Sequence, residues 1–126
     1  MIPKFRAWIK EEKCFADYIE TIRYYAKEVD LCWGGICESD CFDFEGVIFT
    51  QSTGLKDKNG KEIFEGDVLT SQNYPVKGVV EFRTDLGLWV HYLKGYSYFE
   101  YLGNVAGSKE IIGNIYENPE LLEVTE

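Results

Sequence analysis

The sequence predicts a mainly β fold with minor helix, arranged as a small closed or nearly closed β-barrel. Short apolar runs such as "GVIF" and "GVVEF" are bounded by glycine or charged residues. Candidate strands recur about every 8 to 12 residues with glycine-containing turns between them, which is typical of small barrels. A chain of 126 residues fits a single domain over residues 1–126, and it can bury a core without a disulfide or a metal.

The N-terminal part, residues 1–43, is the least decided, and we expect it to pack on the barrel-like core. "KFRAWI" alternates apolar and polar positions and predicts a strand. Residues 18–27 fit two structures, because their apolar residues lie at helical spacing whereas their tyrosines and β-branched residues favour strands. An α+β fold follows if this segment is helical. From Val29 onward alternation favours a strand, and "WGGICESDC" has the composition of a loop.

Residues 44–117 are expected to form the barrel-like core. "FDFEGVIFT" predicts a strand or a bent pair with Gly46 at the bend. "VLTSQ", "GVVEF", "LWVHYL", "YSYFEYL" and "IIGNIY" predict further strands, and "NYPVKG" predicts a turn. "RTDLG" is typical of a hairpin loop around a tight turn, and Gly113 suggests a bulge.

A short C-terminal helix is expected over residues 118–124. Asn118 can cap the helix, and Pro119 is tolerated at the first helical position because that backbone nitrogen needs no partner there.

The charge of the chain bears on its partners. Thirteen basic and 22 acidic residues give a net charge of −9. Such a protein repels a phosphate backbone unless its basic residues gather on one face, so a basic protein partner is favoured over nucleic acid. No segment approaches the roughly 20 apolar residues that span a bilayer, and the N-terminus lacks the apolar core of a signal peptide. We therefore expect a cytoplasmic protein without a membrane partner.

The four cysteines, Cys14, Cys32, Cys37 and Cys41, do not show the close pairs of a zinc site. One site using all four thiolates remains the alternative to free, buried or half-buried thiols, which are the commoner outcome in a reducing cytosol. Catalytic motifs are also missing. His91 is the single histidine and lies in an alternating strand, and no serine-hydrolase, zinc-protease or phosphate-loop motif is present. We therefore predict a non-enzymatic protein with no cofactor and no metal.

A charged, glycine-rich stretch, Ser52 to Leu69, has two interpretations. As a binding surface it would present Lys56, Lys58, Asn59 and Lys61. As turn chemistry, Asp57 would bond its own backbone, glycines would supply positive φ, and apolar residues would anchor the loop to the core. The turn interpretation accounts for more of the residues.

A cluster of aromatic residues is the second candidate surface. Exposed rings on a barrel face bind extended or proline-rich peptides and stack on bases, but small β cores also use aromatic residues for packing. "YSYFEYL" carries rings on both faces, so part of the cluster should be exposed. The residues selected as a recognition face are Trp89, Tyr96 and Tyr98.

Three stretches resemble one known family. "KFRAW", "TGLKDKNGKEIFEGDVL" and "IIGNIYENPELL" are similar, in the same order, to the YopX family, and the likeness spans nearly the whole chain but is weakest from Cys14 to Asp43. The resemblance implies a β-rich fold of SH3-like character and an origin in a phage or prophage, with action inside a bacterial host. It implies no catalytic residues, because the biochemical role of the family is not established.

These observations predict a phage-derived accessory protein that works as a protein-interaction module with an unknown host or phage partner. A nucleic-acid-binding barrel is the alternative, and an uncharacterised enzyme is the third. Self-association is expected as a further possibility, because exposed strands and aromatic patches pair readily.

Overall fold

The computed structural model describes residues 4–71 and 76–122, except for the side chains of Ile36, Cys37, Lys94 and Leu122. Strands dominate and helices are single short turns, so the mainly β prediction is confirmed. The chain forms two compact units, Met1–Gln51 and Ser52–Glu126. The prediction of a single domain stays a prediction.

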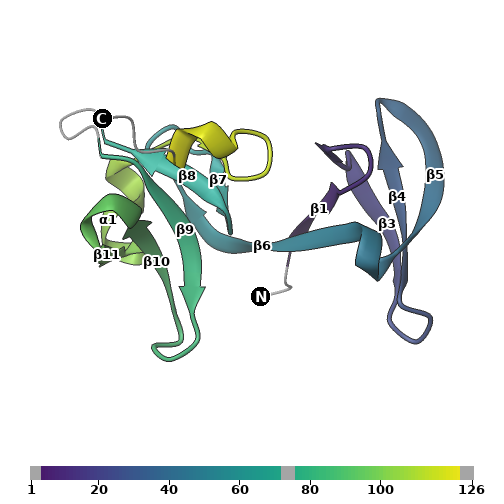
Figure 1. Ribbon diagram of the computed structural model, residues 1–126, viewed down its shortest axis with the longest axis horizontal. Helices are drawn as coiled ribbons and strands as arrows, with labels where there is room; N and C mark the ends of the chain where they lie inside the picture. The colour runs from purple at the N-terminus through teal and green to yellow at the C-terminus, as the bar shows by residue number, and fades with distance from the viewer. Residues whose placement is uncertain (1–3, 72–75, 123–126) are drawn as a thin grey trace. The chain divides into compact units, whose positions relative to one another are not determined.

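The first unit is built from antiparallel strands (Figure 1). β1 pairs with β2 and with the beginning of β6, while β3, β4 and β5 form a three-stranded sheet. Apolar side chains from β1, β4 and β6 form a buried cluster of Ala7, Ile9, Val29, Leu31 and Val47. The strands are β1 (Phe5–Ile9), β2 (Cys14–Phe15), β3 (Tyr18–Arg23), β4 (Glu28–Trp33), β5 (Ile36–Asp43) and β6 (Val47–Lys56).

The helical alternative for residues 18–27 is wrong. This segment is strand β3 followed by a turn into β4. Ile19 pairs with Leu31 and Ile22 with Val29, and a register shift between Ile19 and Thr21 adds one residue to β3. Two isoleucines three residues apart therefore face the same core, because the bulge changes the usual two-residue period. The apparent helical spacing was the spacing of a bulged strand.

The loop predicted for "WGGICESDC" is also wrong. Gly34 and Gly35 have φ values of 71° and 77°, and they connect β4 to β5 as a two-residue hairpin turn. This turn needs positive φ at both positions, which glycine adopts without strain. The polar residues that suggested a loop belong to β5, an outer strand whose Glu38, Ser39 and Asp40 are exposed. A 3₁₀ turn, η1 (Phe44–Gly46), then bends the chain into β6, as the sequence predicted.

The second unit contains a five-stranded antiparallel sheet in the order β11-β10-β9-β8-β12 (Figure 1). Its core contains Ile63, Leu69, Val80, Leu102 and Ala106. A bulge between Ile111 and Gly113 confirms the predicted irregularity in the last strand. The strands are β7 (Glu62–Phe64), β8 (Asp67–Thr70), β9 (Gly78–Arg83), β10 (Leu88–Leu93), β11 (Tyr98–Tyr101) and β12 (Glu110–Asn114).

Short helical turns connect and close this sheet. η2 (Lys94–Tyr96) links β10 to β11, while α1 (Leu102–Val105) and η3 (Ala106–Ser108) link β11 to β12. The C-terminal helix is confirmed in place as a 3₁₀ turn, η4 (Pro119–Leu122), and residues 123–124 of the predicted helix lie outside the described residues. The predicted "NYPVKG" turn also falls largely on residues 72–75, outside the description. Within the described ranges, no helix is long and apolar enough to cross a membrane.

Candidate functional site

A buried histidine lies on β10, the strand next to the β11 edge of the five-stranded sheet. His91 lies on β10 and is completely buried. Its Nε2 lies 3.3 Å from the carbonyl oxygen of Leu69, and its Nδ1 lies 3.4 Å from Oε2 of Glu100. Both ring nitrogens therefore face acceptors. A neutral imidazole has one N–H and satisfies only one of them, whereas the protonated ring satisfies both.

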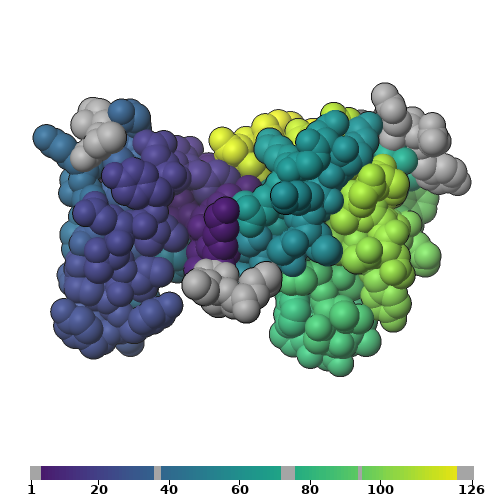
Figure 2. Space-filling view, turned by 180° about the vertical axis from the view of Figure 1, so that it is seen from behind, coloured from purple at the N-terminus to yellow at the C-terminus, as the bar shows by residue number. Residues whose placement is uncertain are grey.

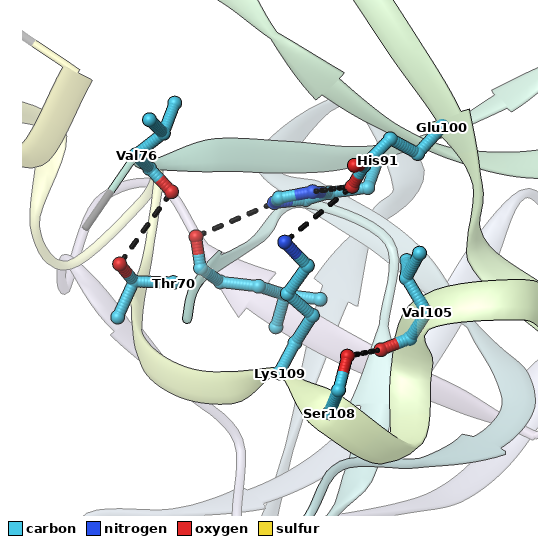
Figure 3. A network of polar contacts seen from close by, with 8 residues as sticks. Thr70, Val76, His91, Glu100, Val105, Ser108 and Lys109 are labelled. Carbon is cyan, nitrogen blue, oxygen red and sulfur yellow. Dashed lines mark hydrogen bonds and ion pairs between the residues drawn. The ribbon is translucent and has the colours of Figure 1, made fainter. Parts of the chain in front are cut away.

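Glu100 and Lys109 complete a charged cluster around this ring (Figure 3). Glu100 lies opposite His91 in the β10–β11 ladder, and Lys109 comes directly before β12. The Lys109 ammonium lies 3.5 Å from the same Oε2 that faces His91. The lysine side chain is 11% exposed and the glutamate side chain 25% exposed. The chain therefore places a partly exposed carboxylate and a largely buried ammonium beside a histidine that solvent does not reach.

Burial controls the protonation of the histidine. Loss of water around the ring lowers the pKa of His91, and the nearby Lys109 charge acts in the same direction. Glu100 and the Leu69 carbonyl oppose this by favouring the charged ring, but burial is the larger effect. His91 is therefore neutral at pH 7. Because it is fully enclosed, Glu100 and Lys109 are the groups of this cluster that can touch a ligand.

A pocket of about 340 Å³ opens beside Glu100 and Lys109. Its other lining residues are Val76, Leu93, Tyr96 and Tyr98. Tyr96 is 68% exposed and Tyr98 56% exposed, so their rings stand at its rim rather than in the core. Apolar walls with a few polar groups are typical of sites that bind a ligand or a partner side chain.

A second hollow, of about 500 Å³, lies along β11 and shares two lining residues with the first pocket, Tyr98 and Glu100. Its remaining walls come from β11, from α1 and from the residue directly before β11, and they consist of Ser97, Phe99, Tyr101, Asn104 and Val105. In the space-filling view, the light-green segment that includes β11 and α1 lies at the surface of the second unit (Figure 2). The two hollows make β11 the centre of the candidate site.

The predicted aromatic face is thus divided by the structure. Tyr96 and Tyr98 border the pocket. Trp89 is half-buried, packs against the core of the second unit, and meets Phe82 edge to face at 5.1 Å. The three rings belong to different elements, because Trp89 lies on β10, Tyr96 in η2 and Tyr98 at the start of β11.

The charged loop serves the fold, as its turn chemistry predicted. Asp57 is buried, and its carboxylate accepts hydrogen bonds from the backbone N–H groups of Asn59, Lys61 and Ile111. Burial alone would raise the pKa of Asp57, but these three donors lower it below its ordinary value. Gly54, Gly60 and Gly66 have positive φ, and Ile63 is fully buried. The loop is therefore anchored to β12 and to the core.

The four polar residues selected on this loop all lie at its surface, and none lines the pocket. Lys58 pairs with Glu110 at 3.7 Å, and the Asn59 amide lies 3.5 Å from the same carboxylate. Lys56 and Lys61 are exposed. The loop residues therefore form a surface of their own, next to the edge strand β12.

Sequence reasoning missed Glu100 and Lys109, and it treated His91 as a residue with no special role. The three lie on β10, on β11 and just before β12, and only the sheet brings them together. One signal was available. Alternation along "LWVHYL" and "YSYFEYL" places His91 and Glu100 on definite faces, but it does not show that these faces coincide.

The first unit has an aromatic hollow of its own. A pocket of about 190 Å³ is lined by Phe5, Ile22, Tyr24, Phe44 and Phe49. Phe44 contacts Phe49 at 5.5 Å and Tyr24 at 6.2 Å, both edge to face. Its described lining residues carry no charge, so the surface that they offer is mainly apolar.

The cysteines of the first unit differ in environment. Cys32 is buried, Cys14 is half-buried and Cys41 is exposed. The Cys41 sulfur accepts a hydrogen bond from Arg23 at 3.4 Å, while Arg23 also binds Asp30 through two hydrogen bonds of 2.7 and 2.8 Å. Partial loss of water around the sulfur and the neighbouring Glu28 charge raise the pKa of Cys41. The described residues contain no group of three or more metal-binding side chains, and the side chain of Cys37 is outside the description.

Comparisons with known proteins identify the family of the chain and two solved structures that are similar to it. The family model described as YopX protein matches residues 4–123. The crystal structure of protein EF1440 from Enterococcus faecalis is similar at 29% identity, covering 98% of this chain and 99% of that one, with a TM-score of 0.65. Protein yopX from Bacillus subtilis has the same fold at 20% identity, covering 97% of each chain, with a TM-score of 0.58. No curated protein matches. The chain therefore belongs to the YopX protein family.

Proposed function

We propose that this protein is a non-enzymatic protein-interaction module that binds its partner at the pocket rimmed by Tyr96 and Tyr98. The observation that carries the proposal is the exposure of these two rings, 68% and 56%, beside a pocket of about 340 Å³. Tyrosine is enriched at protein interfaces because it buries a large apolar area while its hydroxyl remains hydrogen-bonded.

The chemistry of the cluster supports binding over catalysis. His91 is the single histidine of the chain and is enclosed, so it lacks direct contact with a ligand in the pocket. Glu100 and Lys109 reach the pocket as an ion pair, which suits recognition of a polar or charged group on a partner. The net charge of −9 favours a protein partner over a nucleic acid.

Membership of the YopX family supports the biological setting of this proposal. We place the protein in the cytoplasm of a bacterial host, as an accessory protein encoded by a phage or prophage. The partner is a host or phage protein. The order of the five-stranded sheet, in which the last strand returns to pair with the first, supports the SH3-like character proposed for the second unit.

Affinity capture with matched variants tests this function. The tagged protein, a Tyr96→Ala, Tyr98→Ala double variant and a Tyr25→Ala control are incubated with host lysate, with and without phage proteins. Tyr25 is 88% exposed and is not among the lining residues of the pocket, so its loss removes a comparable ring that the proposal does not use.

We expect a specific partner that both the unchanged protein and the control retain and that the double variant loses. Loss of the same partner from the Tyr25→Ala control would place binding elsewhere. Equal capture by all three proteins, or no partner in any lysate, would overturn the proposed function.

A further inference from the structure

We propose that β11 is the docking edge for an extended, basic segment of the partner, which adds to the five-stranded sheet as a further strand. This inference rests on the interaction function proposed above and specifies both the mode of binding and the chemistry of the partner. It is carried by a contrast between the two edges of one sheet, by the two hollows beside β11, and by the placement of Glu100.

The β12 edge of the sheet is covered by the protein itself. The Lys58 N–H donates to the carbonyl oxygen of Lys109 at 2.9 Å, and the Ile111 N–H donates to Asp57 at 3.1 Å. The N–H of Asn114 donates to the side chain of Asn118 at 3.4 Å. A bulge between Ile111 and Gly113 also interrupts the edge. Covering and bulging are the usual ways in which proteins prevent a further strand from pairing.

The β11 edge lacks these devices within the described part of the chain. β11 pairs with β10 on one side and with no described strand on the other. No described turn or loop hydrogen bond reaches the backbone of residues 98–100. In an antiparallel ladder every second residue points its N–H and C=O away from its partner, so these groups are directed outward. β11 also contains neither lysine nor proline, the residues that discourage pairing at exposed edges.

The hollows on β11 are placed to take side chains of an added strand. Such a strand projects successive side chains to opposite faces of the sheet, and strand-addition sites gain affinity from backbone bonds and specificity from pockets. The first pocket offers Val76 and Leu93 as apolar walls, and the second lies along β11 and α1. Tyr98 and Glu100 line both, so the two hollows adjoin the same strand.

Glu100 determines the charge of the segment. Its Oε2 faces both His91 and Lys109, whereas no contact of its Oε1 is found among the described residues. Among the described lining residues of the second hollow, Glu100 carries the charge, and Tyr98 lies on the same face of β11 two residues away. A carboxylate beside an aromatic ring favours a lysine or arginine side chain through ion pairing and cation–π attraction.

A second copy of this chain fits the edge less well than a basic partner. Each copy carries a net charge of −9, so pairing of two β11 edges brings two strongly acidic proteins together. Such pairing also brings Glu100 of both copies to the same short ladder, where like charges oppose each other.

The experiment uses a random dodecapeptide library selected on the full chain, followed by binding measurements with the recovered peptides. We expect extended sequences with a lysine or arginine. Each peptide is then made in two forms, N-methylated at the odd or the even positions. One form should lose about tenfold or more in affinity and the other little, because an added strand uses alternate N–H groups and each lost hydrogen bond weakens binding severalfold.

A charge comparison tests the role assigned to Glu100. Replacing the peptide's lysine by norleucine should weaken binding to the unchanged protein about two- to fivefold, as an exposed ion pair allows. Replacing lysine by norleucine should leave the affinity of the peptide for the Glu100→Gln variant unchanged. Glu81→Gln is the matched control, because it makes the same change of charge on the exposed side of β9, and there the lysine effect should persist.

Strand addition is overturned if both N-methylated forms bind equally or if the library gives no binder, and the basic character of the segment is overturned if the selected peptides are acidic. If light scattering shows that the protein forms dimers, and these dimers dissociate when the peptide binds, the edge belongs to a second copy of the chain. That result would overturn the proposal that a basic segment of a partner binds there. If capture of the partner still depends on Tyr96 and Tyr98 in any of these cases, the interaction function stands and this inference alone falls.

Discussion

The backbone of Gly78 lies against the ring of His91, so closely that a Cβ on the glycine would meet Nε2 at 2.5 Å and Cε1 at 2.8 Å. The two residues lie on the adjacent strands β9 and β10, where Val80 is the direct partner of His91. Gly78 is two residues away and therefore faces the same side of the sheet. The buried histidine is accommodated because this position has no side chain.

Gly78→Ala should destabilise the protein by about 1–3 kcal/mol, the usual cost of forcing a methyl group into a packed core. The added Cβ would also approach the carbonyl oxygen of Tyr92 at 2.8 Å. Urea denaturation measures the free energy of unfolding. Gly103→Ala is the control, because a Cβ at this helical position meets nothing within 4 Å, and its effect should be neutral or slightly stabilising. Equal stability of the two variants would refute the close packing of His91.

Stability should fall as the pH is lowered below about 6.5, the ordinary pKa of histidine. Burial lowers the pKa of folded His91, so the unfolded chain takes up a proton first and the slope of stability against pH is positive. The contribution is complete above the unfolded pKa and is lost as pH falls toward the folded one. His91 is the single histidine, so His91→Gln should flatten the curve within about one pH unit on either side of roughly 6.5, the ordinary pKa of histidine. An unchanged slope would contradict the buried neutral ring.

Asp57→Ala should destabilise the protein by about 2–4 kcal/mol, because it removes the acceptor of three backbone N–H groups. Amide hydrogen exchange should rise at Asn59, Lys61 and Ile111. The exposed Asp43 makes no side-chain capping bond, so Asp43→Ala is the control and should change little. Because the pKa of folded Asp57 is lowered, its contribution is present above about pH 4 and lost as pH falls further.

No stable complex with nucleic acid is expected, even at low salt. The loop presents Lys56, Lys58 and Lys61, and Lys58 is already paired with Glu110. The net charge of the protein is −9, which repels a phosphate backbone. Gel shift with single-stranded and double-stranded probes measures this directly. A shift that weakens in a Lys56→Gln, Lys61→Gln variant, and not in a Tyr96→Ala, Tyr98→Ala variant, would favour the nucleic-acid alternative over the protein-interaction function.

Most strands could be predicted from local patterns. The "RTDLG" hairpin closes as expected, with the N–H groups of Leu86 and Gly87 donating to the Arg83 carbonyl. The errors occurred where local pattern and pairing disagree. A bulge gave β3 the spacing of a helix, and polar residues on the exposed β5 had the composition of a loop. Whether a strand contains a bulge or lies at the edge of a sheet depends on the strands that pair with it. Those partner strands are set by residues distant in the sequence.

The sequence by itself determined the β-rich class, some of the turns, the family and the acidic character, because alternation, glycine placement and charge are local or additive properties. Only the tertiary structure decided that His91, Glu100 and Lys109 form one cluster and that Tyr96 and Tyr98 stand at the rim of a pocket. It also decided that the Asp57 loop covers one edge of the sheet while β11 remains the outer strand at the other. The physical reason is that strand order brings together residues whose proximity no local pattern encodes.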